Sequence, residues 1–244
     1  MIDKKVLIVK NVHRESPGLI KTVLDEYGIP IRLYNPHSHN MKFPNPNDYS
    51  AVIVLGGPQS ANDLEMQNEL EFIARTTGAN IPCFGVCLGM QALVRANGGG
   101  VVKADYQEVG CRDKKGNIYI VELTSEGKTD PLFRSIPHRF PIFQLHGETV
   151  FGGDRILLLG EGDSLYSTAQ EQYQVVKVGK NAYGIQGHLE VTPSMLERWL
   201  QSDKMFDSHD KDTIRQDFKK LEPQYSENGR RIIINFLRIA HLVN

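Results

Sequence analysis

The stretch Ile81-Pro82-Cys83-Phe84-Gly85-Val86-Cys87-Leu88-Gly89-Met90-Gln91 decides how the first half of this chain folds. It begins as a short apolar run with strand character, passes through Gly-x-Cys-x-Gly and continues into a segment with helical character, residues 91–96. Such a layout is typical of a nucleophile elbow, here with a thiol in place of the usual hydroxyl. The two glycines permit a sharp turn and leave room for neighbouring backbone. We therefore expect the Cys87 sulfur at the carboxyl end of a strand and at the start of a helix, where partial positive charge favours a thiolate.

Short apolar strands alternate with helices around this elbow. Apolar, β-branched runs predict strands at residues 6–10, 31–34, 51–55 and 81–86, with helices at about 17–27 and 64–76 between them. Alternation at this pitch predicts βαβ units and a parallel sheet with helices on both faces. The second half has more strand character, and we expect strands at residues 101–102, 118–123, 156–159, 174–178 and 183–186.

The last fifth of the chain is predicted to be helical. A Thr-Pro-Ser sequence at residues 192–194 predicts a helix start, and residues 230–243 have the pattern of an amphipathic helix. The segment between them, residues 203–221, is heavily charged. Because no composition break marks a second domain, we expect one α/β domain over residues 1–200, with residues 201–244 as a helical extension packed on it.

Charge and composition exclude several classes of protein. The 244 residues carry 28 basic and 29 acidic side chains, so no basic field would draw the chain to nucleic acid or to an anionic membrane. No apolar stretch approaches the ~20 residues that span a bilayer. The N-terminus has no cleavable apolar segment, and three cysteines are too few and too odd in number for a disulfide scaffold. We expect a cytoplasmic protein.

Three motifs that could do chemistry each follow a predicted strand. They are Gly-Gly-Pro-Gln-Ser at residues 56–60, the elbow at residues 85–89, and Gly-His-Leu-Glu at residues 187–190. Taken singly, each has a plainer interpretation: a turn, a buried structural cysteine, a surface ion pair. Because open parallel sheets place their sites at the carboxyl ends of the strands, the ordered set of three favours a single site.

The residue types in these motifs predict a thiol-dependent acyl transfer. We expect Cys87 to attack a carbonyl, His188 to act as general base and then as general acid, and Glu190 to orient the imidazole. The backbone amides of Gly57 and Leu88 are candidates for stabilising the oxyanion. The sequence contains no HExxH, no Walker A loop, no GxGxxG and no histidine cluster typical of metal ligands, so we expect no metal and no cofactor.

These motifs resemble those of the class I, or triad, glutamine amidotransferases. Residues 56–60 look like the family's GGPxS oxyanion loop, and residues 85–91 are similar to its GxCxGxQ elbow, which is the most specific element. Residues 182–192 parallel AYGxQFHPEVT, while residues 108–110 and 144–148 resemble the EIG and WHGD segments. The likeness covers roughly residues 4–200 and is greatest to the amidotransferase domain of GMP synthetases and its free-standing relatives.

The resemblance implies a flavodoxin-like fold, with an open, mostly parallel sheet, and hydrolysis of the side-chain amide of glutamine. It implies a γ-glutamyl thioester on Cys87 and release of ammonia, then of glutamate. Gln91 would contact the amino-acid end of the substrate, and Gly147 and Glu148 would line the same pocket. Since nothing in the sequence resembles the SGGxDS nucleotide loop of a synthetase, the resemblance implies a free-standing chain whose ammonia passes to a separate synthetase subunit, if it is channelled at all.

One departure from the family pattern leaves alternatives open. Gly187 and Leu189 stand where the family has Phe and Pro around the histidine, which predicts a more loosely held ring or a wider pocket. A γ-glutamyl peptide hydrolase is therefore an alternative to a glutaminase. A second alternative is a relative that binds a ligand, or senses oxidation through Cys87, without catalysis. A homodimer is also open.

Overall fold

Five parallel strands form one half of the central sheet. The computed structural model describes residues 5–12, 16–36, 42–162 and 173–244, and the account is confined to these. The parallel strands lie in the order β2 (Ile31–Tyr34), β1 (Val6–Val9), β3 (Ala51–Val54), β4 (Cys83–Val86) and β11 (Ala182–Ile185). This is the strand order of flavodoxin-like sheets, in which ligands bind at the carboxyl ends of the strands. The predicted flavodoxin-like α/β fold is confirmed.

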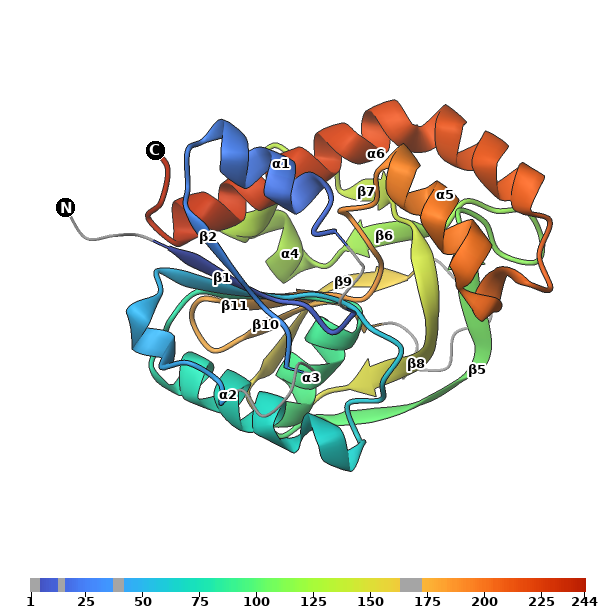
Figure 1. Ribbon diagram of the computed structural model, residues 1–244. Coiled ribbons are helices and arrows are strands. Elements are labelled where there is room, and N and C mark those ends of the chain that lie inside the picture. Colours follow the sequence, from blue (N-terminus) through green and yellow to red (C-terminus); the bar gives the residue numbers. More distant parts are fainter. Residues whose placement is uncertain (1–4, 13–15, 37–41, 163–172) are drawn as a thin grey trace.

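Four antiparallel strands extend the sheet beyond β11. They lie in the order β10 (Tyr173–Val178), β9 (Ile156–Gly162), β6 (Ile120–Leu123) and β7 (Arg139–Pro141). A separate antiparallel ribbon pairs β5 (Gly100–Gly110) with β8 (Gln144–Phe151) and lies beside the sheet (Figure 1). The ribbon matters for function because β8 carries two of the predicted substrate-binding residues, Gly147 and Glu148.

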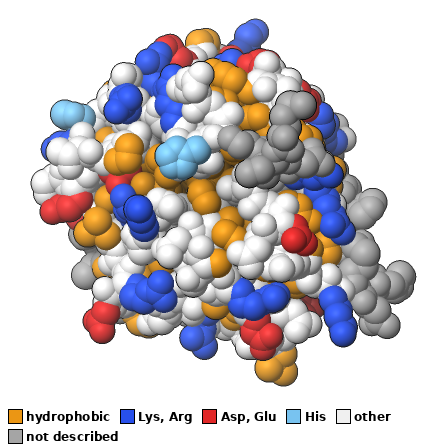
Figure 2. Space-filling view, turned by 90° about the vertical axis from the view of Figure 1, so that its left-hand side faces the viewer, with side chains coloured by type: hydrophobic (Ala, Val, Ile, Leu, Met, Phe, Trp, Pro, Cys, Tyr) orange, Lys and Arg blue, Asp and Glu red, His pale blue; other side chains and the backbone are white. Residues whose placement is uncertain are grey.

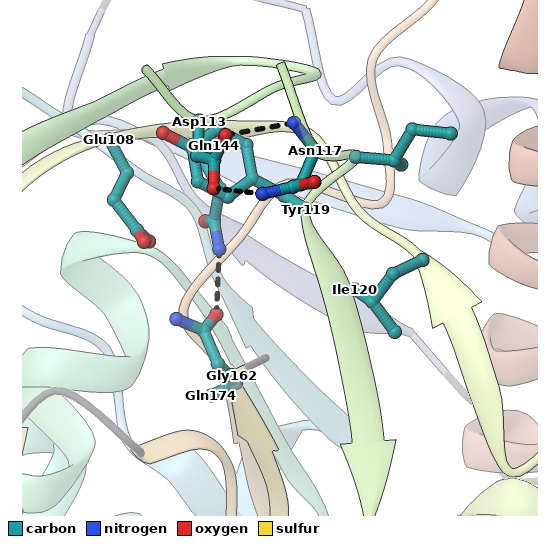
Figure 3. Close-up of a pocket in the computed structure, with 9 residues that line it drawn as sticks. Glu108, Asp113, Asn117, Tyr119, Ile120, Gln144, Gly162 and Gln174 are labelled. Atoms are coloured by element: carbon teal, nitrogen blue, oxygen red, sulfur yellow. Dashed lines mark hydrogen bonds between the residues drawn. The ribbon is translucent and has the colours of Figure 1, made fainter. Parts of the chain in front are cut away.

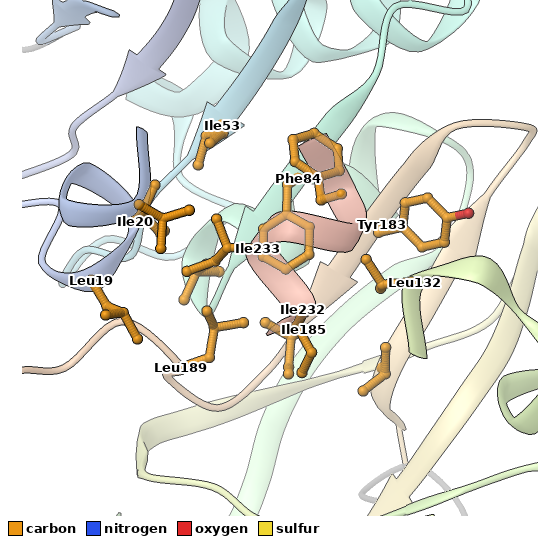
Figure 4. Close-up of a cluster of buried hydrophobic side chains, with 14 of the residues drawn as sticks. Leu19, Ile20, Ile53, Phe84, Leu132, Tyr183, Ile185, Leu189, Ile232 and Ile233 are labelled. Carbon is orange, nitrogen blue, oxygen red and sulfur yellow. The ribbon is translucent and has the colours of Figure 1, made fainter. Parts of the chain in front are cut away.

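Helices cover both faces of the sheet (Figure 1). One face is covered by α2 (Gln67–Gly78) and α3 (Leu88–Ala96), and the other by α1 (Leu19–Glu26), α4 (Ser125–Thr129) and α6 (Lys211–Ile239). The strands alternate accordingly: Val6 and Ile8 belong to the apolar core under α1 and α6, whereas Leu7 and Val9 belong to the core under α2 and α3. Figure 4 shows the first of these cores, in which side chains from α1, α6 and the central strands meet. The shorter helices are α5 (Pro193–Ser202), η1 (Pro46–Asp48), η2 (Leu64–Met66), η3 (Pro131–Phe133) and η4 (Lys204–Phe206).

The C-terminal helix differs from its prediction. It begins at Lys211 rather than at Arg230, because Asp210 caps it by accepting hydrogen bonds from the N–H groups of Asp212 and Thr213. Ile214, Phe218 and other apolar side chains at helical spacing are buried within the segment that we described only as charged. The helix continues through Pro223 and ends at Ile239, so the predicted end at residue 243 was also wrong. The division of the chain at residue 200 stays a prediction.

Three further elements escaped prediction. The pattern indicated β5 only at residues 101–102, and it did not indicate β7, β8 or α4. The strands of the ribbon mix buried and half-exposed polar residues, so they lack the continuous apolar run that reveals a central strand.

Charged side chains of both signs are interspersed on the face seen in Figure 2, without a large single-sign patch. Among the described helices, none combines the length and apolar character needed to cross a lipid bilayer.

Candidate active site

The Cys87 elbow has the strained geometry that its glycines predict. Cys87 has φ 53° and ψ −112° and stands immediately before α3. A Cβ atom on Gly85 would lie 2.4 Å from the carbonyl oxygen of Gly89, and one on Gly89 would lie 2.1 Å from that of Val54. Neither position can hold a side chain, so the strand and helix approach each other only because both residues are glycine. The turn places the Cys87 sulfur at the N-terminus of α3, where the helix dipole favours negative charge.

His188 and Glu190 lie on the loop that follows β11, the strand next to β4. Nδ1 of His188 is 2.7 Å from Oε1 of Glu190, and both side chains are buried. The other carboxylate oxygen of Glu190 accepts a hydrogen bond from the N–H of Leu189 at 3.0 Å. Glu190 is thereby fixed in one orientation, which in turn fixes the tautomer and the plane of the imidazole.

The His188 ring is tightly held, although Gly187 replaces the family's phenylalanine. The ring packs edge-on against Trp199 of α5, with 4.9 Å between the ring centroids. The backbone N–H of His188 donates to the carbonyl oxygen of Phe143 at 2.7 Å. A Cβ atom on Gly187 would lie 2.4 Å from Cγ1 of Ile142, so an aromatic side chain does not fit there. The expected loss of an aromatic contact to the ring is therefore wrong, because Trp199 of α5 supplies one. The other expectation, a wider pocket, stays a prediction.

The electrostatic surroundings of His188 favour its protonated form. Burial alone would lower the pKa of His188, but the Glu190 carboxylate, hydrogen-bonded to Nδ1, and the neighbouring Cys87 sulfur raise it well above its ordinary value. A proton on His188 is therefore stabilised both by Glu190 and by the Cys87 sulfur.

All three predicted motifs meet at the carboxyl ends of the parallel strands. A Cβ atom on Gly56 would lie 3.2 Å from Cε1 of His188 and 3.4 Å from Cβ of Cys87, so these two side chains flank the same glycine. Gly57 follows at once, and Leu88 is the first residue of α3, whose first-turn N–H groups have no acceptor within their own helix. The loop, the elbow and the histidine are therefore brought together as predicted from their order in the sequence.

A cavity of about 420 Å³ opens onto Cys87 and His188. One side is formed by the loop after β3, and the other by α5 and the turn that follows it. Its lining residues are Val12, Gly56, Gly57, Pro58, Cys87, Leu145, His188, Trp199, Ser202, Asp203, Lys204 and Met205. The cavity is large enough for an amino-acid amide and leaves the sulfur accessible to a substrate.

The predicted substrate-binding residues form a connected cluster beside the elbow. Nε2 of Gln91 donates to the carbonyl oxygen of Glu148 at 3.2 Å, and Ser60 donates from its hydroxyl to the Glu148 carboxylate at 2.9 Å. Gly147 lies next to Glu148 on β8. Gln91, Gly147 and Glu148 are not among the residues that line the 420 Å³ cavity, although Leu145, two residues before Gly147 on β8, does line it.

One residue of the site was missed by sequence reasoning. Gln186 is fully buried, with its Nε2 3.9 Å from the Cys87 sulfur and its Oε1 accepting from Gln91 at 3.3 Å. The N–H of Gln186 donates to the carbonyl oxygen of Gln174, whose side chain accepts from Gln144 at 2.9 Å (Figure 3). Gln186 thus links the nucleophile to Gln91 and to the antiparallel strands. Its position in the stretch 182–192, two residues before His188, was the signal available.

Comparison with known protein families decides the family. The model of the family "Glutamine amidotransferase class-I" matches residues 17–207, which is most of the chain. The chain belongs to the class-I glutamine amidotransferases. The resemblance inferred from the motifs, including the likeness to GMP synthetases, is confirmed.

Relatives of this amidotransferase chain include enzymes that are much longer. A GMP synthase (glutamine-hydrolyzing) of Thermosipho melanesiensis is 29% identical over 192 residues, which cover 77% of this chain but 33% of the relative. The chain therefore spans about one third of the length of that GMP synthase. A glutamine amidotransferase-like protein of Salmonella typhimurium is 23% identical over 238 residues, covering 93% of this chain and 94% of the relative.

Solved structures confirm the fold over nearly the whole chain. A glutamine amidotransferase from Thermotoga maritima has a TM-score of 0.80 at 23% identity, covering 98% of both chains. One from Methylobacillus flagellatus has a TM-score of 0.82 at 19% identity, covering 97% of this chain and 95% of the other. At such identities the likeness establishes the shared fold, helical C-terminal region included.

Proposed function

We propose that this amidotransferase chain hydrolyses the side-chain amide of glutamine through a γ-glutamyl thioester on Cys87. The proposal depends on one observation: Cys87 and the buried His188–Glu190 pair lie at the same open cavity. Within the pair, Nδ1 of His188 is 2.7 Å from Oε1 of Glu190. A nucleophile, a proton carrier and a group that orients the carrier are the parts that acyl transfer by a thiol requires.

The first half of the proposed reaction forms the thioester. Once the proton of the Cys87 thiol has passed to His188, the sulfur attacks the amide carbonyl carbon and forms a tetrahedral oxyanion. The N–H groups of Gly57 and Leu88 stabilise this oxyanion. The imidazolium then gives its proton to the amide nitrogen, the C–N bond breaks, ammonia leaves and the thioester remains.

The second half returns the enzyme to its starting state. Neutral His188 takes a proton from water, whose oxygen attacks the thioester carbonyl under the same two N–H groups. The C–S bond breaks, glutamate leaves, and the thiolate–imidazolium pair is restored. Throughout, Glu190 holds the ring through Nδ1, so it is a positioning residue rather than a proton carrier.

The amino-acid end of glutamine is proposed to bind on the side of Gln91. The Glu148 carboxylate, fixed by the Ser60 hydroxyl, suits the substrate ammonium group. Gln91 shapes the same wall by holding the backbone of β8, next to Gly147, against α3. This assignment leaves the wall of the 420 Å³ cavity that contains Trp199 and Lys204 to face the leaving group.

That cavity favours a second candidate substrate, a γ-glutamyl peptide. Ammonia needs almost no space, yet the side beyond His188 is open and lined by Trp199 and Lys204. A leaving amine with a carboxylate, such as an amino acid, matches a lysine side chain at this position. Steady-state rates on γ-glutamyl dipeptides and on glutamine distinguish the two candidates, and a strong preference for glutamine rejects the second.

The acceptor of ammonia is proposed to lie on a separate synthetase subunit. The support is the naming of relatives as glutamine-hydrolyzing GMP synthases, of which this chain matches about one third. We further propose that residues 1–200 form the amidotransferase unit, that residues 201–244 pack on it, and that the chain acts in the reducing cytoplasm. Stimulation of ammonia release by a candidate synthetase tests the partner.

Ammonia release from L-glutamine tests the proposed function. The wild-type chain, Cys87→Ala and the matched control Cys111→Ala are assayed alone and with candidate synthetase subunits. We expect turnover by the wild type and by the Cys111 variant, and none by the Cys87 variant. Absence of turnover of glutamine and of every γ-glutamyl compound by the wild type contradicts the proposal, as does full activity without the Cys87 thiol.

A further inference from the structure

A buried amide–carboxyl pair lies directly behind the loop that carries Gly57. Asn11 follows β1 and is 4% exposed, while Glu69 lies in the first turn of α2 and is 1% exposed. Nδ2 of Asn11 donates to Oε1 of Glu69 at 3.2 Å and to the carbonyl oxygen of Leu55 at 3.2 Å. Both N–H bonds of the Asn11 amide are therefore used, one toward the carboxyl and one toward the loop.

Two oxygen atoms of this pair are left over. Oδ1 of Asn11 and Oε2 of Glu69 are buried and have no hydrogen-bond partner among the described residues. If Glu69 were ionised, both atoms would be acceptors only, and each would carry the cost of a buried group without a donor. A proton on Oε2 removes both deficits at once, because a carboxylic acid and a primary amide can form two hydrogen bonds face to face.

The surroundings of Glu69 favour that proton. Burial raises the pKa of Glu69 from its usual 4.5 to about 7, although the hydrogen bond from Asn11 opposes the shift. Among the residues that the structure describes, the ionisable groups that face it are Tyr34, at the end of β2, and Cys83, at the start of β4. Burial, followed by the negative charge of Glu69, raises the pKa of each of them. Neither group is cationic, so neither supplies a positive charge that would stabilise a carboxylate.

The pair contacts the oxyanion loop at three successive points. The side-chain amide of Asn11 donates to the carbonyl oxygen of Leu55, just before Gly56. The backbone carbonyl oxygen of Asn11 accepts a hydrogen bond from Nε2 of Gln59 at 3.4 Å. A Cβ atom on Gly57 would lie 2.7 Å from Cβ of Asn11, so the loop backbone rests directly on this side chain. Any movement of Asn11 would move the Gly57 N–H that is proposed to stabilise the oxyanion.

We propose that Glu69 is a neutral carboxylic acid that donates from Oε2 to Oδ1 of Asn11, and that the resulting pair is a positioning device for the Gly57 oxyanion donor. The positioning role in this proposal rests on the proposed glutamine hydrolysis. The protonated state of Glu69, by contrast, can be tested without any enzyme activity.

Infrared spectroscopy tests the chemical part without an assay. The difference spectrum between the wild type and Glu69→Gln at pH 6 is expected to contain the C=O stretch of one protonated carboxyl, which disappears with a midpoint near pH 7. The matched control is Glu71→Gln, which replaces an exposed glutamate two residues further along α2. Absence of the band at pH 6, in a Glu69→Gln variant with native circular dichroism, overturns the proposal.

Kinetics test the positioning part. Glutamine at residue 69 can donate to Asn11 as the neutral acid does, so Glu69→Gln is expected to match the wild-type kcat at pH 6. At pH 8, where the wild-type carboxyl is mostly ionised, the variant is expected to exceed the wild-type kcat by up to about tenfold. Glu69→Met, which cannot hydrogen-bond, is expected to lose on the order of 10²-fold in kcat with KM unchanged.

The two kinds of failure are distinguishable. A carboxyl band without glutamine turnover rejects the proposed function and leaves the protonated pair standing. Normal turnover without the band rejects the pair and leaves the proposed function standing. A Glu69→Met variant that is folded and has the wild-type kcat overturns the positioning role, whichever way the infrared result falls.

Discussion

Two buried glutamates lie behind the candidate site, and they face different partners. Glu190 contacts the His188 imidazole, which can take up a proton, whereas Glu69 contacts the Asn11 amide, which cannot. The negative charge of Glu190 raises the pKa of His188, but burial raises the pKa of Glu69 itself to about 7. The contrast teaches that burial alone does not decide whether a carboxyl group is charged. The proton resides on the member of each pair whose protonated form has the lower free energy. In the Asn11–Glu69 pair only the carboxyl group can be protonated, since the amide is not a base at neutral pH.

The same substitution at the two glutamates gives the largest expected contrast. Glu190→Gln removes the charge that supports and orients His188, so we expect kcat on glutamine to fall by on the order of 10⁴-fold. Glu69→Gln is expected to leave kcat unchanged at pH 6. Steady-state kinetics measure the difference, and an NMR titration of His188 should show its pKa falling in Glu190→Gln, because burial is then opposed only by the Cys87 sulfur. Equal losses in both variants would break the comparison.

A methyl group at Gly57, on the loop between the His188–Glu190 and Asn11–Glu69 pairs, is expected to give the next largest loss of kcat. In Gly57→Ala the new Cβ would lie 2.7 Å from Asn11 Cβ and 3.1 Å from Leu88 Cδ2, so the loop must shift. Loss of one oxyanion donor lowers kcat by about 10²–10³-fold. Gly78→Ala is the control, because a Cβ there meets nothing within 4 Å. Wild-type kcat in a folded Gly57→Ala would show that the loop does not donate to the oxyanion.

The free energy of unfolding should depend on pH through Glu69, with a definite sign. Its pKa is about 7 in the folded state against a usual 4.5, so between these values the folded state binds the extra proton. The contribution of Glu69 protonation to the free energy of unfolding is fully present below pH 4.5 and is lost as the pH rises through about 7. It amounts to about 3 kcal/mol over that window at about 1.4 kcal/mol per pH unit.

Urea unfolding at several pH values measures this contribution. The wild type minus Glu69→Gln difference isolates it from the other titrating groups, including His188. A difference that stays constant from pH 4.5 to 7.5 would contradict a raised pKa for Glu69.

The aromatic contact to His188 is expected to have the smallest effect. Trp199→Leu removes the edge-on ring, and aromatic pairs of this kind contribute about 0.5–1.5 kcal/mol, which corresponds to a loss of about 2–10-fold in kcat. Trp199→Phe keeps a ring and should restore most of the activity, and neither variant should alter the titration of Glu69. A loss beyond 10²-fold in Trp199→Leu would mean that Glu190 does not hold the imidazole by itself.

Local patterns were enough to predict the parts of the molecule that lie at strand ends. The apolar runs before Gly56 and Cys87 revealed β3 and β4, and the glycines of the elbow revealed the turn. Because parallel strands end at one edge, these motifs could be brought together without coordinates, as could the loop of His188.

The remaining features depend on contacts between distant segments. Trp199 approaches His188 only because α5 folds over the loop, and Asn11 meets Glu69 across 58 positions of sequence. The residue types alone do not predict these roles. A tryptophan on an amphipathic helix usually packs in the core, and a glutamate near a helix start usually interacts with the helix dipole. β8 and most of β5 were missed for the same reason, since pairing rather than apolar character defines these two strands.

Active-site labelling tests the central claim most directly. The protein is incubated with 6-diazo-5-oxo-L-norleucine, an electrophilic mimic of glutamine, and the modified residue is mapped by mass spectrometry. Burial raises the pKa of Cys83 and of Cys111 to about 12, so these two thiols are internal controls of low reactivity. We predict modification at Cys87 alone, suppressed by excess L-glutamine. Modification of Cys83 or Cys111 instead, or labelling of Cys87 that glutamine does not slow, would contradict the account.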